Sequence, residues 1–408
     1  QNIIKYDPDV AGLTVMTHEV NQASEIASRI KAYRDIPVII GGCHVTALPE
    51  RTLAEFPVFD YGVCGEGERT IVELLKCVMQ GSMELRVHSV KGIAYRDRGQ
   101  IIVNTPRPFM TDIELDALPY PAFHHYYADN TRALAVDQFS YTIFTSRGCP
   151  YNCAFCMQVL GRKVRRRSKQ SILNEMDYAI KRYGAHTFGF DDEVFLFNSQ
   201  DTRDLLEAFI QRDFPNRIKW SALTRANFVT LELAALAKKA GCYRLGMGVE
   251  SGDDEILKSI GKGITVAQIK KAVEIVKKIG ISLDTYYIFG HPGETIETLK
   301  KTADLAVRLN TNTIAVGLMV PYPGTRIYDM ALRGENGYRL LSQDWAEYDK
   351  YGSKVLEIEG LPHADMLKWQ KRTLLNLYLK NFRILDCLKF FWKRRRAIYY
   401  VIKKEFSG

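Results

Sequence analysis

Residues 146–158 read SRGCPYNCAFCMQ, which places Cys149, Cys153 and Cys156 within eight positions of one another. Three thiolates on one short loop can converge on a soft metal centre, either zinc or an iron–sulfur cluster. The neighbouring residues offer no obvious fourth ligand. A closed structural zinc site has four ligands, whereas a cluster held by three cysteines leaves one iron open to a substrate or cofactor. The spacing therefore favours an iron–sulfur cluster with an open iron, with a zinc knuckle as the alternative.

A regular alternation of apolar runs and helical periods starts at this loop. We expect six strands with helices between them, and the cysteine loop follows the first strand. The expected strands cover residues 141–146, 186–191, 218–223, 243–249, 282–289 and 313–320, and the expected helices cover 170–183, 201–212, 231–240, 266–279 and 296–309. This rhythm is typical of a complete or partial βα barrel, whose chemistry lies in the loops after the strands.

The residues before the barrel show a second pattern of strands and helices. Apolar runs at 10–16, 38–42 and 61–65 alternate with helical periods at 23–33 and 52–56. This predicts βαβ units with a parallel sheet, as in half of a doubly wound domain. A hairpin is expected within residues 90–103.

The fold class is therefore α/β, and we expect four parts. Prolines at positions 106, 108, 119 and 121 indicate a linker between two domains. The expected parts are a partial Rossmann-like domain at 1–110, a linker at 111–140, the barrel at 141–334 and a basic, largely helical extension at 335–408.

The cysteine spacing, with Phe155 directly before the last cysteine at the start of a barrel, resembles the radical S-adenosylmethionine (SAM) superfamily. Three later segments fall in the order that this family uses: GFDDEVF, GMGVESGDDEILKSIGKG and YYIFGHPGET. The resemblance implies a 4Fe–4S cluster held by the three cysteines and SAM chelated to the open iron. It also implies one-electron cleavage of SAM to a 5′-deoxyadenosyl radical.

The same resemblance implies contacts to SAM after successive strands. Carboxylates after the second strand would accept hydrogen bonds from the SAM ammonium, and an arginine after the third would pair with its carboxylate. The end of the fourth strand would contact the ribose, and glycines after the fifth would admit the adenine. The residues so assigned are Asp191, Asp192, Arg225, Glu250, Ser251, Gly290 and Glu294, together with Phe155. Each also has an ordinary interpretation, such as a solvated strand end, a surface arginine, a capping serine or a turn.

The N-terminal part resembles cobalamin-binding domains. Those domains carry an S-x-L motif followed, some two dozen residues later, by a pair of glycines. This chain has Thr14-Val-Met16 and then Gly41-Gly42 at a compatible gap. The phrases GGCHVTALPE and YGVCGEGERT resemble the cobalamin-domain radical SAM proteins that include the anaerobic magnesium-protoporphyrin ester cyclase and class B methylases. The resemblance implies cobalamin at Thr14, Gly41 and Gly42, because paired glycines after a strand let the backbone approach a large cofactor.

One motif of those domains is missing. Their D-x-H-x-x-G segment supplies the lower ligand of cobalt and would precede residue 1, and neither His18 nor His44 stands in its place. The chain starts with Gln1 just before an apolar strand, so we expect that the N-terminus is truncated. Three alternatives follow: a truncated cobalamin binder, a base-off binder that needs no histidine, or a relative that keeps the domain as a scaffold.

These features predict a radical SAM enzyme that methylates an organic substrate or rearranges it oxidatively, with cobalamin where it is bound. The alternatives are a methylthiotransferase-like enzyme that modifies tRNA and a non-catalytic iron–sulfur electron carrier. Methylthiotransferases carry a second cluster of three cysteines upstream, whereas Cys43, Cys64 and Cys77 are widely spaced and are interpreted as buried apolar residues. Electron carriers usually supply four cysteines.

The net charge of +9 lies in one tail. Residues 361–408 contain twelve Lys and Arg against three Asp and Glu, so the remainder is formally neutral and nucleic acid is not favoured as a partner. A basic, aromatic helix expected within residues 388–404 could lie on an anionic membrane, or pack on the barrel with its charges solvated.

Eight cysteines are too few for a disulfide scaffold, and no apolar run reaches the ~18–20 residues of a membrane span. We therefore expect a cytoplasmic protein, peripheral at the membrane if the tail binds lipid. The expected partners are a small-molecule or lipid-like organic substrate and a one-electron reductant such as flavodoxin or ferredoxin.

Overall fold

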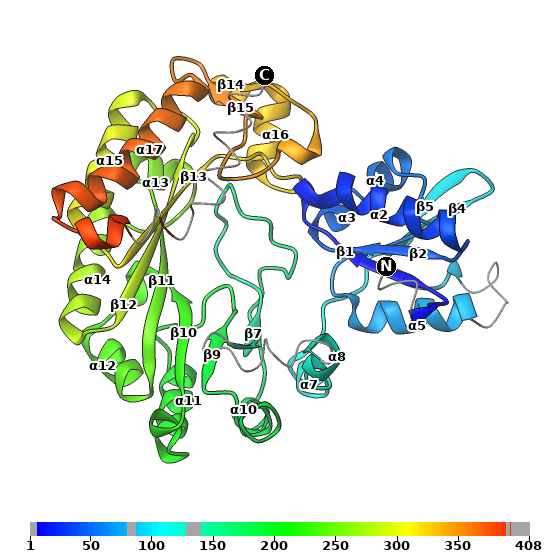
Figure 1. Ribbon diagram of the computed structural model, residues 1–408, viewed down its shortest axis with the longest axis horizontal. Helices are drawn as coiled ribbons and strands as arrows, with labels where there is room; N and C mark the ends of the chain where they lie inside the picture. The colour runs from blue at the N-terminus through cyan, green and yellow to red at the C-terminus, as the bar shows by residue number, and fades with distance from the viewer. Residues whose placement is uncertain (1–5, 80–86, 128–139, 389–391, 393–408) are drawn as a thin grey trace.

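The computed structural model describes residues 6–79, 87–127, 140–388 and 392, and its N-terminal part is a five-stranded sheet in the order β1-β2-β3-β4-β5 (Figure 1). Strands β1 (Ala11–Thr14), β2 (Val38–Gly41) and β3 (Tyr61–Val63) are parallel. Strands β4 (Ile93–Asp97) and β5 (Gln100–Val103) are antiparallel and form the expected hairpin.

Helices cover both faces of this sheet. Because side chains alternate along a strand, β2 presents Val38 and Ile40 to α2 (Val20–Tyr33), and it presents Ile39 to α5 (Gly67–Met79) on the other face. Two shorter helices follow β2, namely α3 (Cys43–Ala47) and α4 (Pro49–Glu55). The expected half of a doubly wound domain is confirmed.

All six expected barrel strands are present, and every neighbouring pair is parallel. They are β6 (Tyr141–Ile143), β9 (Thr187–Phe190), β10 (Lys219–Thr224), β11 (Cys242–Glu250), β12 (Ser282–Phe289) and β13 (Thr313–Leu318). Their order is β13-β12-β11-β10-β9-β6, so β6 and β13 are the two edges of a partial barrel.

The helices between these strands lie on the outer face of the barrel (Figure 1). The five longest are α10 (Lys169–Tyr183), α11 (Gln200–Gln211), α12 (Leu231–Lys239), α14 (Val266–Ile279) and α15 (Ile296–Leu309). Each begins after a serine or threonine whose hydroxyl accepts a hydrogen bond from a backbone N–H of the first turn, which is the favoured N-cap. Polar N-caps in the sequence therefore mark the helix starts.

Helix α16 (Arg326–Arg333) ends the barrel part, and the C-terminal extension contains α17 (His363–Lys380), which packs on α15 and β13. Between them, β14 (Tyr338–Leu340) and β15 (Leu356–Ile358) pair antiparallel. No helix of the described residues is long and apolar enough to span a bilayer. The basic helix expected at 388–404 lies, apart from residues 388 and 392, outside the described residues.

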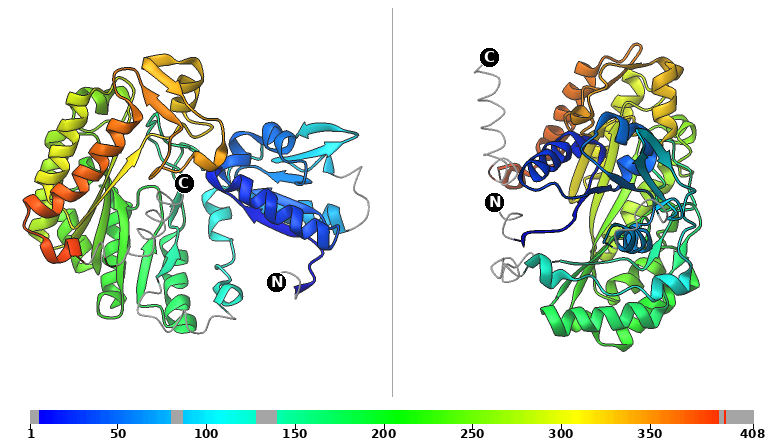
Figure 2. Two further views of the ribbon diagram at one scale, coloured as in Figure 1. Left: turned by 45° about the horizontal axis from the view of Figure 1, so that its top comes forward. Right: turned by 90° about the vertical axis from the view of Figure 1, so that its right-hand side faces the viewer.

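The N-terminal domain meets the segment of residues 320–350 (Figure 2). Trp345 is buried there, and its indole N–H donates to Glu55 at 2.6 Å. The guanidinium of Arg51 lies 4.6 Å from the Trp345 ring, and the His44 ring meets its edge at 4.9 Å. This anchor brings the carboxyl ends of β1 and β2 to the mouth of the barrel.

Candidate active site

The cysteine loop follows β6 and is fixed by backbone contacts at both ends. Gly148 has a φ of +95°, and a Cβ there would lie 2.4 Å from the Lys163 carbonyl oxygen, so only glycine fits. The Cys149 N–H donates to the Gly161 carbonyl at 3.1 Å, and the Ala154 N–H donates to Ile260 at 2.8 Å. The loop is therefore held against the rest of the barrel.

The three thiols of this loop lie close enough to interact electrostatically. Burial raises the pKa of Cys149, and the nearby positive charge of Arg225 opposes this increase. No three His, Cys, Asp or Glu side chains in the described ranges converge on a single ion. The three soft donors suit a cluster, in which each thiolate binds a different iron.

Asp192 holds the start of the cysteine loop. Its carboxylate accepts hydrogen bonds from the Thr145 N–H at 2.6 Å, from the Thr145 hydroxyl, and from the Ser146 hydroxyl at 2.8 Å. Burial raises its pKa to about 6, although these hydrogen bonds lower it. Asp191, by contrast, is exposed. Both Asp192 oxygens are engaged within the protein, and SAM contacts from either aspartate stay predictions.

Glu193 is the member of the acidic run that faces the cysteines. It interacts electrostatically with Cys149 and Cys156, and its Oε2 is buried without a hydrogen-bond partner. A buried carboxylate oxygen without a partner is costly, so this atom calls for a ligand donor such as an ammonium group. The sequence shows the run of three acids, but not which one turns inward.

Arg225 lies beside the cysteine loop, as the resemblance implies. It is 5% exposed, its guanidinium is 3.5 Å from the Tyr151 ring centroid, and it donates to the Lys262 carbonyl. No carboxylate among the described residues forms an ion pair with it. A buried cation without a counter-ion is unfavourable, which suits the predicted role of binding the SAM carboxylate.

Glu250 ends β11 in the left-handed region, with a φ of +66° at a register shift in the sheet. Its carboxylate accepts a hydrogen bond from Lys262 Nζ at 2.6 Å, and both side chains are 8% exposed. Lys262 Nζ also lies 5.8 Å from the Phe155 ring. Sequence reasoning missed Lys262. The one signal in the sequence was that it stands between two glycines, Gly261 and Gly263. In the structure both glycines have a φ of +67°.

The turn after β12 is built around Glu294. Its Oε2 accepts from the Gly290 N–H at 2.5 Å and the His291 N–H at 3.3 Å, whereas its Oε1 is buried without a partner. Burial raises the pKa of Glu294 to about 8 and lowers that of His291 to about 4, so both side chains are largely neutral near pH 7. Gly290 has a φ of +102°, and a Cβ there would meet Met319 at 2.9 Å.

Ser251 is fully buried, and its hydroxyl lies 3.2 Å from Thr302 Oγ1 and accepts from the Asp253 N–H at 3.2 Å. These bonds hold the turn after β11. A ribose contact from Ser251 stays a prediction.

Four of the buried polar atoms without partners among the described residues lie at this end of the barrel. They are Glu193 Oε2, Tyr287 Oη, His291 Nδ1 and Glu294 Oε1. Such atoms are rare in folded proteins and are normally satisfied by a ligand or water. Together with the thiols and the cations, they fit a 4Fe–4S cluster with SAM.

The predicted cobalamin residues lie at the carboxyl edge of the N-terminal sheet. Thr14 is exposed and pairs with Gly41 at the ends of β1 and β2. Gly42 has a φ of +103°, and a Cβ there would lie 2.4 Å from the Val15 carbonyl oxygen. Cys43 follows at once and interacts electrostatically with Tyr322 of the barrel. The predicted cobalamin residues therefore share one edge, and this edge faces the barrel.

A cavity of about 400 Å³ lies inside the barrel beside the cysteine loop. Phe155 of the cysteine loop and Glu250 line one part of it, and Tyr322 lines another part. Tyr322 is also the lining residue that interacts electrostatically with Cys43, which follows Gly41 and Gly42 in the N-terminal domain.

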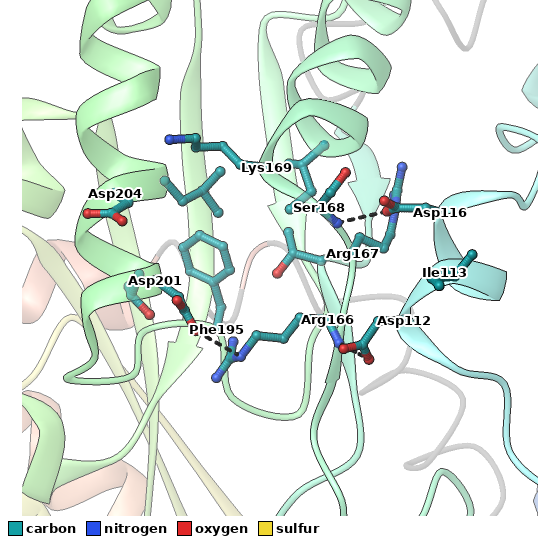
Figure 3. Close-up of a pocket in the computed structure, with 14 residues that line it drawn as sticks. Asp112, Ile113, Asp116, Arg166, Arg167, Ser168, Lys169, Phe195, Asp201 and Asp204 are labelled. Atoms are coloured by element: carbon teal, nitrogen blue, oxygen red, sulfur yellow. Dashed lines mark hydrogen bonds and ion pairs between the residues drawn. The ribbon is translucent and has the colours of Figure 1, made fainter.

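Another cavity, of about 530 Å³, lies where α7 (Asp112–Asp116) meets the first turns of α10 and α11 (Figure 3). The Arg166 N–H donates to Asp112 at 3.0 Å, and the Arg166 guanidinium lies 3.8 Å from Asp201. The Ser168 N–H donates to Asp116 at 2.8 Å. This cavity is a charge-paired contact with the linker, and none of the predicted site residues lines it.

A buried ion cluster joins the two domains beside the cysteine loop. Glu66, from the loop after β3, accepts from Arg165 at 2.8 Å, from Arg147 at 3.0 Å and from the Met110 N–H at 2.7 Å. The two arginines lie in the paired strands β7 (Ser146–Arg147) and β8 (Arg165–Arg166), which enclose the loop. The N-terminal domain thus helps to position the cysteines.

The chain matches two known families, the radical SAM superfamily over residues 143–306 and the B12 binding domain over residues 1–75. It is 32% identical over 381 residues to the "uncharacterized methyltransferase PH0819" of Pyrococcus horikoshii, covering 93% of this chain and 80% of that protein. It is 25% identical to the anaerobic magnesium-protoporphyrin IX monomethyl ester cyclase of Rubrivivax gelatinosus, covering 90% of this chain but only 65% of the cyclase.

Two solved structures share the fold. TsrM from Kitasatospora setae, a radical SAM methyltransferase with cobalamin and a 4Fe–4S cluster bound, has a TM-score of 0.68 at 21% identity, covering 91% of this chain and 78% of that chain. OxsB, a cobalamin-dependent radical SAM enzyme with aqua-cobalamin and SAM bound, has a TM-score of 0.64 at 24% identity, covering 91% and 54%. The expected architecture, a B12-type domain followed by a partial barrel, is therefore confirmed.

Proposed function

The chain belongs to the radical SAM superfamily and carries a B12 binding domain. We propose that it is an enzyme that methylates an organic substrate, or rearranges it by a cyclase-type reaction. The substrate would lie between the cluster with its SAM and the cobalamin. The observation that carries the proposal is the cavity lined by Phe155 of the cysteine loop and by Tyr322, the residue that interacts electrostatically with Cys43 of the N-terminal domain.

When bound, the cluster supplies the electron that cleaves SAM to a 5′-deoxyadenosyl radical, and cobalamin supplies a methyl carrier. Cys149, Cys153 and Cys156 would hold the cluster. Arg225 and Glu193 offer opposite charges on the two sides of the loop, which suits the carboxylate and the ammonium of SAM.

The test is release of 5′-deoxyadenosine by protein reconstituted anaerobically and given SAM and a strong reductant. We expect release from the wild type and from Cys387→Ser, whose thiol lies in the C-terminal extension, but none from Cys153→Ser. Absence of release from wild-type protein with an intact cluster absorbance contradicts the proposal.

A tRNA-modifying methylthiotransferase is the second candidate, because a putative methylthiotransferase of Methanocaldococcus jannaschii is 26% identical to this chain. The three upstream cysteines do not support it: Cys64 donates to the Val45 carbonyl, Cys77 is buried in a separate apolar cluster, and Cys43 contacts Met16. Iron content that is unchanged when all three are replaced by serine would remove this candidate.

The partners are proposed on chemical grounds. The reaction needs an external one-electron donor of the flavodoxin or ferredoxin type, and the basic tail is proposed to contact anionic lipid. Sedimentation with anionic liposomes, with and without the residues after 380, tests the lipid contact. Equal binding by both forms would show that the tail is not responsible for lipid binding.

The cytoplasmic location stays a prediction.

A further inference from the structure

We propose that the cavity next to Phe155 binds a planar aromatic carboxylate, with Lys350 as the partner of the carboxylate group. The proposal rests on the proposed function and adds to it the chemical class of the substrate. Neither charge patterning nor motifs in the sequence indicate Lys350, because it lies in the C-terminal extension rather than in the barrel.

The walls of the cavity form an apolar slot. One side is the inner surface of β12 and β13, where Ala315 and Gly317 leave room for a ligand. The Tyr286 side chain reaches from β12 across β11, because a Cβ on Gly246 of β11 would lie 2.8 Å from the Tyr286 hydroxyl. Further aromatic walls come from Phe155, Tyr287, Tyr322 and Tyr351. Flat rings pack favourably against such walls in offset or edge-to-face arrangements.

The charges that line the cavity leave one cation unpaired. Glu250 is neutralised by Lys262 at 2.6 Å. Lys350, the other charged residue of the lining, is exposed at the mouth, forms no ion pair with a carboxylate of the described residues, and has its Nζ 5.1 Å from the Tyr351 ring centroid. The adjacent Asp349 accepts from the Tyr351 N–H at 3.4 Å and does not line the cavity. A single lysine matches a singly charged carboxylate, whereas a phosphate dianion calls for further cations.

The backbone fixes Lys350 at the open edge of the barrel. Its carbonyl accepts a hydrogen bond from the Leu318 N–H at 2.8 Å, at the end of β13. A Cβ on Gly317 would lie 3.8 Å from the Lys350 Cβ, so the two residues share the inner face of the sheet. With Lys350 at the mouth and the aromatic walls further in, the substrate is oriented with its ring toward Phe155 and its carboxylate outward.

Equilibrium dialysis of the reconstituted, SAM-loaded protein against indole-3-acetate and its neutral amide, indole-3-acetamide, tests the assignment. We expect the acid to bind at least about fivefold more tightly than the amide. Lys350→Gln should abolish this preference, whereas Lys354→Gln, a change at an exposed lysine four residues away, should retain it. Gly317→Val should weaken both ligands, because it fills the slot while the nearest neighbours of its Cβ stay at 3.5 Å or more.

Equal binding of the two probes by the wild type, no binding of either, or a preference that survives in Lys350→Gln would overturn the assignment. Release of 5′-deoxyadenosine by the same wild-type preparation distinguishes failure of the substrate assignment from failure of the proposed function. Release without a preference for the acid refutes the substrate class alone, whereas an intact cluster without release refutes the proposed function.

Discussion

Three buried ionisable residues at the ends of β11 and β12 control how the site is held. Lys262 and Glu250 neutralise each other in the interior, and Glu294 organises the turn after β12 through backbone hydrogen bonds. Burial makes an unpaired charge costly, so substitutions here affect the free energy of unfolding as well as SAM binding.

Lys262→Met leaves the Glu250 carboxylate buried without a partner. We expect a loss of about 3 kcal/mol in the free energy of unfolding, measured by urea denaturation. Lys258→Met, on the exposed side of the preceding helix, is the control and should change little. The double variant Lys262→Met/Glu250→Gln should recover part of the loss. Equal stability of the two single variants would contradict the structural role of the pair.

Glu294 should make the protein more stable at low pH. Its pKa is about 8 in the folded protein and ordinarily 4.5, so its stabilising contribution is complete below pH 4.5 and is lost as the pH rises through 8. Glu294→Gln keeps the neutral form. Relative to the wild type, this variant should therefore be more stable at pH 8 than at pH 5, by about 1–4 kcal/mol in urea denaturation. The exposed Glu297→Gln is the control, and a pH-independent difference for Glu294→Gln would refute the assignment.

The residues that the sequence could identify are those with a local signature. The three cysteines lie on one loop, so their spacing alone predicts a metal centre. Lys262 could not be predicted, because its contact with Glu250 depends on the loop after α13 (Asp254–Ser259) folding back under Phe155. It also could not be predicted that Glu193, rather than Asp192, faces the cysteines. Asp192 is instead hydrogen-bonded to Thr145 and Ser146.

At the scale of elements, the loop after β3 controls the strands that enclose the cysteines. Glu66 is 8% exposed and meets Arg165, which is 5% exposed, so the contact is a buried charge pair between domains. Glu68 pairs with Arg147 at a more exposed position. The two carboxylates thus differ in burial while they serve the same pair of strands.

Glu66→Ala should leave Arg165 buried without its counter-ion and loosen β7 and β8. We expect faster hydrogen exchange across residues 146–166 and a loss of about 3 kcal/mol in the free energy of unfolding. Glu68→Ala is the matched control, with an expected loss below about 1 kcal/mol. Unchanged exchange in Glu66→Ala would show that the cysteine loop does not depend on the N-terminal domain.

At the scale of the whole molecule, the cavity is enclosed by the cysteine loop, the barrel strands β12 and β13 and the C-terminal extension, and the N-terminal domain approaches it at Tyr322. The strands and helices of both domains follow from local periodicity and polar N-caps, and the sequence predicts them closely. The arrangement of the parts does not follow, because it depends on contacts between distant residues, such as Trp345 with Glu55 and Lys350 with Leu318. Periodicity carries no information about such contacts.

The central claim is that one chain holds a cluster and cobalamin around a shared cavity. Metal analysis of protein reconstituted with iron, sulfide and cobalamin and then desalted tests it most directly. The account predicts about four iron atoms and about one cobalt atom on each chain. Iron without cobalt would contradict it, because the N-terminal domain would then be only a scaffold beside a radical SAM barrel.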